Sequence, residues 1–511
     1  MATILTTAQL TDKQKKNRDR FFLIVTFALV FLIAIRTPLD SDMWWHLRAG
    51  ETTWQTGRPL LVDLFSFTRY GTGWTNIHWL FQLGMYLLDK VGGLTLLAGM
   101  VATLAATSLF LLTFQMDGPV LFKSFLLILA SFVAAPVWVA RPELGSYVLI
   151  SVVGYILYLY KWRKRDRLWV LVPVFILWAN LHPGYVYGLM LIAAMLGGEV
   201  LNHLVWPGGE NILTWREIIK LGLWGLASGF ALLINPTGIQ AWILPFQTVG
   251  FNAIKNEISE WASPDFHQFF QQPFIWLMLL TVIAIGLSQR RLDGSDLVAF
   301  AGFTYLSLIA RRNFGPFALV TTPILARYAW PALTQWEARI RPAVEAFMAR
   351  LELSPASLSH LSTSNEKHSR VINLAVFAFL VLASAGRLYY ATFPSVIQAG
   401  EAELYPVKAV AWMESHHPQG NLFNSYNWGG YLIWFARDYP VFVDGRTDVY
   451  GDTIINQWLT VANGKEGWQK ILDQWHIHLI LLEPGWPITA LLPQNGWKIL
   501  YQDSNSVLFG R

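Results

Sequence analysis

The distribution of apolar residues along the chain predicts membrane-spanning helices. A helix needs about twenty predominantly apolar residues to cross the hydrocarbon core of a bilayer. Apolar runs lie near residues 21–35, 94–115, 119–137, 144–160, 168–180, 183–203, 219–234, 273–287, 296–310, 315–329 and 371–391. The runs number about eleven and predict a polytopic α-helical membrane protein.

The pattern changes after residue 391. Short segments with strand character lie near 421–423, 440–443, 478–482, 497–500 and 506–509, and helical stretches lie near 407–415 and 465–474. Short strands mixed with helices are typical of an α/β domain. We therefore expect a transmembrane domain over residues 1–391 and a small α/β domain over residues 392–511. Between them, residues 353–370 are rich in Ser, Thr and His and predict a flexible connector.

Clusters of basic residues give the orientation of these spans. Basic residues between Lys13 and Arg20 precede the first run. Three later clusters follow the fourth run between Lys161 and Arg167, the eighth at 290–291, and the tenth between Arg339 and Arg370. Loops rich in Lys and Arg stay on the cytoplasmic side. The three clusters agree with one count of spans, so they predict a cytoplasmic N-terminus and an extracytoplasmic C-terminal domain.

Composition narrows the chemistry that the chain can carry. Hydrophobic residues make up 54% of the 511 positions, the mean hydropathy is +0.38 and cysteine is absent. The absence of cysteine excludes disulfides, thiolate catalysis and cysteine-ligated metals. The net charge of +5 comes from short basic loops rather than from one basic face. This distribution predicts a protein that contacts membrane lipid and does not bind nucleic acid.

Two carboxylates lie at the outer end of the first span, in a predicted external acidic loop over residues 37–77. Asp40 and Asp42 stand close to hydrocarbon, where an ionisable group is costly and functional by default. One interpretation makes Asp42 or Ser41 the N-cap of a following helix. The other makes Asp42 or Asp40 a general base that takes a proton from an acceptor hydroxyl.

The helix predicted after this pair should lie along the membrane surface. Met43, Leu47, Gly50 and Trp54 follow at spacings of three or four residues and share one face. Carboxylate oxygens suit Mg²⁺ or Mn²⁺, so a divalent cation held by Asp40 and Asp42 is a further expectation.

Three arginines fall at predicted outer ends of spans. Arg141, Arg311 and Arg312 each carry a planar fork of N–H donors that matches phosphate oxygens. A phosphate leaving group needs such donors as negative charge develops on it. The alternative is that these side chains bind lipid headgroups or extend to the interface. The adjacent pair 311–312 opposes the positive-inside tendency, which favours the phosphate-binding interpretation.

Further polar residues on the outer side are accessory candidates. His46 and His182 could assist proton transfer, although a single histidine is more often a hydrogen-bonded structural residue. Glu143 and Glu260 could reach the same site or remain solvated loop charges. In the C-terminal domain, residues 424–430 and 443–452 look like loops at one sheet edge, where a turn is as plausible as a ligand site.

The first loop resembles that of the C-type glycosyltransferase superfamily (GT-C). The run from Asp40 to Glu51, followed by Gly57-Arg58-Pro59, is similar to the stretch in protein mannosyltransferase and arabinosyltransferase relatives, where an Asp-Glu pair precedes a helix. This chain has Asp-Ser-Asp in place of adjacent acids, and we favour Asp42 as the base. The chain also resembles uncharacterised bacterial membrane proteins with Trp-Gly-Gly-Tyr and Val-Asp-Gly-Arg near the end.

The resemblance implies a glycosyltransferase of the bacterial plasma membrane. Such an enzyme moves a sugar from a polyprenyl-phosphate donor to an acceptor hydroxyl on the outer face, with inversion. The acceptor stays open. One alternative is a non-catalytic scaffold or assembly subunit that keeps the fold, since fold does not fix function. Another is a transporter, which the near absence of charged residues within the predicted spans disfavours.

Overall fold

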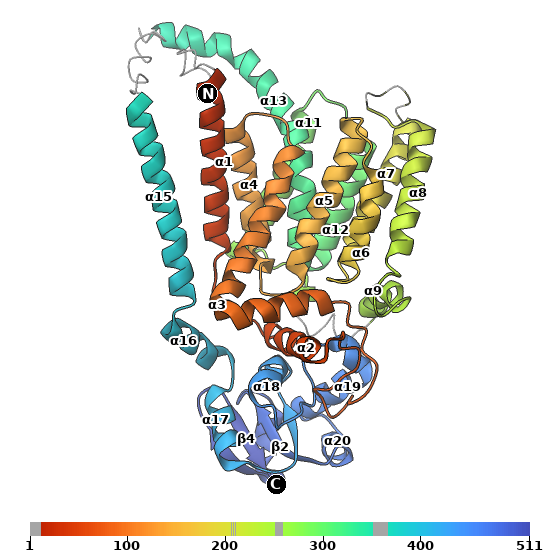
Figure 1. Cartoon of the computed structure of the whole chain (residues 1–511), viewed down its shortest axis with the longest axis vertical. Coiled ribbons are helices and arrows are strands. Elements are labelled where there is room, and N and C mark those ends of the chain that lie inside the picture. Colours follow the sequence, from red (N-terminus) through yellow and green to blue (C-terminus); the bar gives the residue numbers. More distant parts are fainter. Residues whose placement is uncertain (1–11, 206, 208, 210, 251–258, 351–365) are drawn as a thin grey trace.

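The computed structural model describes residues 12–205, 207, 209, 211–250, 259–350 and 366–511. A bundle of long, roughly antiparallel helices forms one part, and a small sheet with short helices lies beyond one end of it (Figure 1). The N-terminal helix begins at the opposite end of the bundle from the sheet. The connector predicted at 353–370 falls mostly outside the described residues.

Each predicted apolar run coincides with a helix of the bundle. The bundle helices are α1 (Asp12–Ala34), α3 (Trp79–Phe110), α4 (Val120–Ala134), α5 (Glu143–Trp162), α6 (Leu171–Trp178), α7 (Tyr185–Val205), α8 (Trp215–Ala231), α11 (Gln272–Leu287), α12 (Gly294–Ile309), α13 (Phe314–Arg350) and α15 (Glu366–Ala391).

Length and composition qualify only some of these helices as membrane spans. Among the described residues, six helical segments are long and apolar enough to cross a bilayer, and two apolar helices are shorter. The protein is therefore a polytopic helical membrane protein, while the number of about eleven spans stays a prediction. The six are Trp79–Phe114, Val120–Val137, Glu143–Trp162, Tyr185–Val205, Phe269–Leu287 and Arg370–Ala391; the shorter two are Leu168–Trp178 and Gly294–Ile309.

Two helical segments lie across the end of the bundle that faces the sheet (Figure 1). α3 bends at Gly92 and Gly93, where Gly93 has a φ of 58° that glycine tolerates best. Its first part packs against α2 (Met43–Thr56), the helix predicted after the acidic pair. A Cβ atom at Gly50 would lie 2.2 Å from the backbone oxygen of Gln82, so glycine allows the two helices to cross closely.

The predicted face of α2 is partly confirmed. Met43, Leu47 and Gly50 are buried, whereas Trp54 is half-exposed. The buried side includes Trp44 and Trp45 as well, because α18 (Gly429–Phe435) of the C-terminal part covers α2 from the other direction. The position of α2 in the membrane interface stays a prediction.

The C-terminal part contains a four-stranded sheet in the order β1-β2-β4-β3. β1 (Asn421–Asn424) is parallel to β2 (Ile477–Leu482), and β4 (Val507–Gly510) is antiparallel to both β2 and β3 (Lys498–Gln502). The helices of this part are α16 (Pro394–Leu404), α17 (Val407–His416), α18, α19 (Thr447–Ala462), α20 (Trp468–Gln474) and α21 (Ile488–Leu491). Four of the five predicted strands are confirmed.

The strand predicted at 440–443 is wrong, because this segment pairs with the external loop instead of the sheet. Val441 forms an isolated bridge with Ser66, and Phe67 N donates a hydrogen bond to Val441 O at 3.2 Å. Phe442 N donates to the side-chain oxygen of Asn424 at 2.8 Å. The loop predicted at 443–452 is also shorter than expected, since α19 begins at 447.

The sheet connects two apolar cores. Leu479 and Leu481 of β2 belong to the core that continues through α2 into the bundle, while Ile480 and Leu482 belong to a separate core with α19 and α20. Alternate residues of a strand point to opposite faces, which explains the division. The C-terminal part is therefore packed against the bundle through α2. The boundary at residue 391 stays a prediction.

Buried charges join four helices at the other end of the bundle. Lys161 and Glu199 are fully buried and form an ion pair, and Lys161 Nζ lies 2.6 Å from Asp293 Oδ1. Arg327 pairs with Asp296 beside them. The sequence led us to expect spans nearly free of charge. Arg327 nevertheless lies within α13 and Glu199 within α7, where they and their partners neutralise one another, which hydropathy does not reveal.

Candidate active site

Asp42 is held by side chains rather than used as a cap. It occupies the N-cap position of α2, yet its carboxylate accepts no backbone hydrogen bond there. Instead Trp45 Nε1 donates to Asp42 Oδ1 at 3.1 Å, and Arg141 Nη1 lies 3.1 Å from Asp42 Oδ2. Asp42 N donates to Asp40 Oδ1 at 3.0 Å. The side-chain capping interpretation of Asp42 is therefore wrong.

Arg141 connects three carboxylates from separate parts of the chain. Its Nε and Nη2 atoms donate to the two oxygens of Asp40 at 2.6 and 2.8 Å, and Nη1 also lies 3.0 Å from Glu260 Oε1. Burial lowers the pKa of Arg141, but the carboxylates of Asp40, Asp42 and Glu260 raise it well above its ordinary value. Arg141 therefore keeps its charge and fixes the geometry of the acidic pair.

The surroundings of Asp42 shift the pKa of its carboxyl group toward neutral pH. Burial raises the pKa of this carboxyl, Arg141 lowers it, and the negative charge of Asp40 raises it again. The result is a pKa of about 7, compared with an ordinary value of 3.8. A carboxylate with this pKa is suited to accept a proton at physiological pH.

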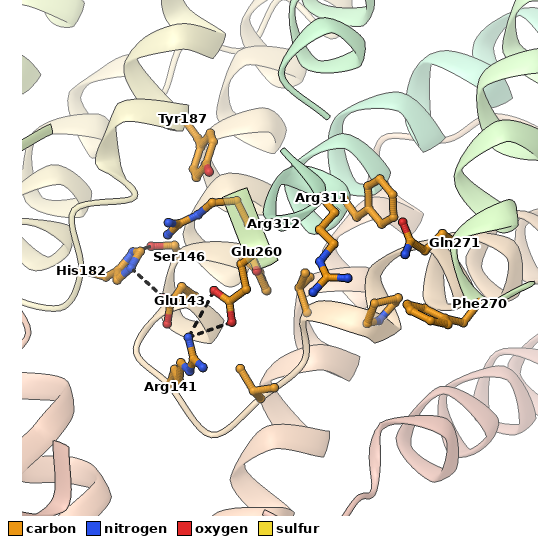
Figure 2. A pocket seen from close by; sticks show the side chains of 15 residues that line it. Arg141, Glu143, Ser146, His182, Tyr187, Glu260, Phe270, Gln271, Arg311 and Arg312 are labelled. Atoms are coloured by element: carbon orange, nitrogen blue, oxygen red, sulfur yellow. Dashed lines mark hydrogen bonds and ion pairs between the residues drawn. The ribbon is translucent and has the colours of Figure 1, made fainter. Parts of the chain in front are cut away.

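A cavity of about 310 Å³ opens next to Arg141 (Figure 2). Arg311 and Arg312 enter it from the short turn η6 (Arg311–Asn313) between α12 and α13. The guanidinium of Arg312 lies 4.5 Å from the ring centroid of Trp261, a cation–π contact. Neither Arg311 nor Arg312 forms an ion pair with any residue that the structure describes. Both are half-buried and thus available to an anion in the cavity.

Glu143 and His182 form a second polar pair in the cavity. His182 Nε2 lies 3.7 Å from Glu143 Oε1. Gly184 N donates to His182 Nδ1 at 2.9 Å, which places the proton of the neutral ring on Nε2, toward Glu143. Among described residues, the other carboxylate oxygen of Glu143 is buried without a hydrogen-bond partner. Ser146 and Tyr147 line the same cavity.

His46 lies behind the site rather than in it. Its ring packs on Trp45 with 3.6 Å between centroids, and Gln82 Nε2 lies 3.2 Å from its Nδ1. The ring of His78, which was not a candidate from the sequence, lies between those of His46 and His182, with ring centroids 5.5 and 5.4 Å away. Burial lowers the pKa of His46 well below 6.5 and that of His78 to about 3, so both rings are neutral.

The cavity thus brings together most of the residues predicted from the sequence. Arg141, Arg311, Arg312, Glu143, His182 and Glu260 line it, and Arg141 connects it to Asp40 and Asp42. The phosphate-binding role of Arg141 stays a prediction. Its donors face carboxylates, so Arg311 and Arg312 are better placed for that role.

The carboxylate pair does not fit a divalent cation as it stands. Both oxygens of Asp40 accept from Arg141, and the two oxygens of Asp42 face Arg141 and Trp45. Among the described residues, no group of three or more His, Asp and Glu side chains is arranged to hold a metal ion. A cation here would have to displace the guanidinium, and the predicted Mg²⁺ or Mn²⁺ stays a prediction.

A turn of the C-terminal part completes the wall around Asp42. Asp444, Gly445 and Arg446 lead into α19, and a Cβ atom at Gly445 would lie 1.9 Å from Asp42 Oδ1. Arg446 Nη1 lies 2.7 Å from Asp63 Oδ1 of the external loop, and all of these charged side chains are fully buried. The Val-Asp-Gly-Arg motif was the sequence signal for this turn, but nothing local indicated its contact with Asp42.

Comparisons with known proteins show the fold. No protein-family model matches the sequence, and no curated protein is similar to it in sequence. The structure is similar to the archaeal oligosaccharyltransferase AglB from Archaeoglobus fulgidus, solved with an inhibitory peptide and a dolichol-phosphate. The TM-score is 0.51 at 12% identity, covering 92% of this chain and 70% of that one.

It is also similar to ArnT from Cupriavidus metallidurans bound to undecaprenyl phosphate. Here the TM-score is 0.46 at 14% identity, covering 95% of this chain and 97% of that one. The similarity to AglB extends from the helical bundle into the C-terminal part. Over most of its length, the chain has the fold of the AglB structure, as the resemblance of its first loop to the C-type (GT-C) superfamily led us to expect.

Proposed function

We propose that this protein is a glycosyltransferase that moves a sugar from a polyprenyl-phosphate donor to an acceptor hydroxyl, with inversion, on the outer face of the membrane. The observation that carries the proposal is one cavity lined by three arginines. Two of them, Arg311 and Arg312, form no ion pair with the described residues, and the third, Arg141, fixes a pair of carboxylates beside the cavity. The similar AglB structure contains a dolichol-phosphate, which supports a lipid phosphate as the ligand.

Arg311 and Arg312 bind the phosphate of the donor. The cavity lies at one end of the apolar bundle, so a polyprenyl tail can remain among lipids while its phosphate reaches the two guanidinium groups. Arginine offers several N–H donors in a plane and keeps its charge at every working pH. These charges stabilise the leaving phosphate as negative charge develops on it.

Asp42 is the general base. The acceptor oxygen forms a bond to the anomeric carbon of the sugar while its proton moves to the Asp42 carboxylate. The bond between that carbon and the phosphate oxygen breaks, and polyprenyl phosphate leaves with the electron pair. Arg141 and Trp45 orient the base, and Asp40 holds Arg141 in place through two hydrogen bonds.

The remaining polar residues have supporting roles in this proposal. Glu143 has a buried oxygen that can accept a hydrogen bond from a sugar hydroxyl, and His182 fixes the opposite oxygen. Glu260 comes from the turn η4 (Ser259–Trp261) and closes the third side of Arg141. The plasma-membrane location and the cytoplasmic N-terminus complete the proposal, based on the basic clusters at the end of the bundle remote from the cavity.

Replacement of each group tests the proposal. In a host that lacks its own copy of the protein, Asp42→Asn should abolish the envelope glycan that the wild-type protein restores, as read by mass spectrometry. Exposed Asp438 provides the matched control, since Asp438→Asn makes the same chemical change away from the cavity. Full glycosylation with both Asp42→Asn and Asp40→Asn in place would refute the enzyme and favour the scaffold.

A lipid-binding assay distinguishes the role of Arg311 and Arg312 from that of Asp42. Undecaprenyl phosphate should raise the thermal unfolding midpoint of the detergent-purified wild-type protein and of Asp42→Asn. In the double variant Arg311→Gln/Arg312→Gln, the same lipid should raise the unfolding midpoint much less. Arg167→Gln is the control, because Arg167 is exposed at the other end of the bundle. An equal response in all four proteins would show that the two arginines do not bind the lipid phosphate.

A further inference from the structure

The C-terminal part touches the proposed base directly. A Cβ atom at Gly445 would lie 1.9 Å from Asp42 Oδ1 and 3.3 Å from Trp45 Nε1. Such a carbon–oxygen separation is far below any non-bonded contact, so one of the two groups would have to move. Gly445 has no left-handed backbone conformation in this turn. The requirement for glycine here is therefore space for the Asp42 carboxylate.

The turn that carries Gly445 is held rigidly. Arg446 donates to both oxygens of Asp444, through Nε at 2.8 Å and Nη2 at 2.6 Å, and reaches Asp63 of the external loop through Nη1 at 2.7 Å. Tyr450 also donates to Asp444. Moving a turn anchored by fully buried ion pairs would leave buried charges unpaired, so the carboxylate is the group that yields.

A second glycine fixes the same relation between the two parts of the chain. A Cβ atom at Gly430, at the start of α18, would lie 2.1 Å from the backbone oxygen of Ser41, one residue before Asp42. The backbone and the carboxylate at the start of α2 are thus both in contact with the C-terminal part. On the opposite side, Arg141 holds the carboxylate at 3.1 Å.

From these contacts we infer that Gly445 is a positioning residue for glycosyl transfer: the Asp444-Gly445-Arg446 turn forms the wall that places the Asp42 carboxylate. The role in glycosyl transfer rests on the proposed function, whereas the contact between Gly445 and Asp42 does not. It makes the C-terminal part a component of the active site rather than an appended module. A methyl group at residue 445 would displace the base from Arg141 and Trp45 while leaving Arg311 and Arg312 undisturbed.

Two readouts test the inference, with Gly485→Ala as the matched control because a Cβ atom there would meet no other atom within 4 Å. The first is envelope glycan formation. Gly445→Ala should reduce it about 100-fold, since a displacement of about 1 Å at a reacting group has an effect of this size, and Gly485→Ala should stay near wild type. Stabilisation by undecaprenyl phosphate should be retained in both variants.

The second readout is a double-mutant cycle on thermal stability, which does not depend on catalysis. Gly445→Ala should lower the unfolding midpoint of the full-length protein in detergent, and the loss should disappear in the Asp42→Ala background, where the carboxylate is gone. If Gly445→Ala alone fails to fold, a folded Asp42→Ala/Gly445→Ala variant would show equally that the Asp42 carboxylate causes the loss. Equal losses in both backgrounds, or two unfolded proteins, would overturn the contact.

The two experiments distinguish the proposals. If the double-mutant cycle shows no coupling between residues 42 and 445, the positioning role is overturned, whatever reaction the protein catalyses. Coupling with normal glycan formation in Gly445→Ala would overturn the catalytic part of it. Normal glycan formation in Asp42→Asn would remove the proposed function while leaving the structural contact established.

Discussion

Replacing Asp42 by Asn should make the protein inactive and, at alkaline pH, more stable. The Asp42 carboxyl is mostly buried, next to Arg141 but also next to the negative Asp40. Asn has nearly the shape of a protonated Asp, and its oxygen can still accept the hydrogen bond from Trp45. The substitution therefore removes the ionised state of this group and, with it, the ion pair with Arg141.

The size and sign of the effect follow from the pKa of Asp42. Burial raises this pKa from 3.8 to about 7 in the folded protein, against the lowering effect of Arg141. Below pH 3.8 the carboxyl is protonated in both states, so no stability is lost. As the pH rises toward 7, the unfolded chain gives up this proton first and the folded state becomes progressively disfavoured. Above pH 7 the accumulated loss is about 4 kcal/mol, as an upper value.

Thermal unfolding of the detergent-purified protein measures this loss, with tryptophan fluorescence as the signal. Asp42→Asn should raise the unfolding midpoint at pH 8.5 and leave it nearly unchanged at pH 4. Asp40→Asn should lower it at both values, because it breaks the two-bond contact with the buried Arg141. A gain for Asp42→Asn that is the same at both pH values, or absent at pH 8.5, would refute the reasoning.

Three further outcomes are expected. Arg446→Met should lower stability by about 3–5 kcal/mol in denaturant unfolding, because it leaves buried Asp63 and Asp444 without a counter-charge; recovery in a background with both Asp63→Asn and Asp444→Asn would confirm the cause. Gly50→Ala should weaken the packing of α2 on α3, since its Cβ would meet the backbone of Gln82, and limited proteolysis of the external loop should accelerate. EDTA should leave glycan transfer unchanged if Arg141 keeps both carboxylates; a loss that Mn²⁺ restores would show that a metal displaces it.

Sequence alone could predict which residues share the site because orientation rules constrain loops. Basic clusters fix the direction of the spans, so Asp40, Arg141 and Arg311 fall at one end of the bundle although they are far apart in the chain. The acidic motif and the arginine pair were visible because charges beside apolar runs are rare. The helix after Asp42 was visible from its spacing of apolar residues.

The finer arrangement could not be predicted because it depends on long-range packing. That Arg141 would bind three carboxylates depends on how the turn η4, which contains Glu260, lies against Arg141. The contact between Gly445 and Asp42 joins residues about 400 positions apart through a turn whose local sequence indicates only a turn. His78 carried no signal at all, since its role is defined by the two rings beside it.

Charge balance around the cavity explains why the arginines differ. Burial raises the pKa of Asp42, and Arg141 offsets only part of this effect because it also faces Asp40 and Glu260, so Asp42 can hold a proton at neutral pH. Arg311 and Arg312 bring two positive charges to the other side of the cavity, with Glu143 as the nearby anion. A donor phosphate would offset that excess. In the proposed reaction, the new negative charge on the departing phosphate would lie beside these two guanidinium groups, while the proton from the acceptor neutralises the Asp42 carboxylate.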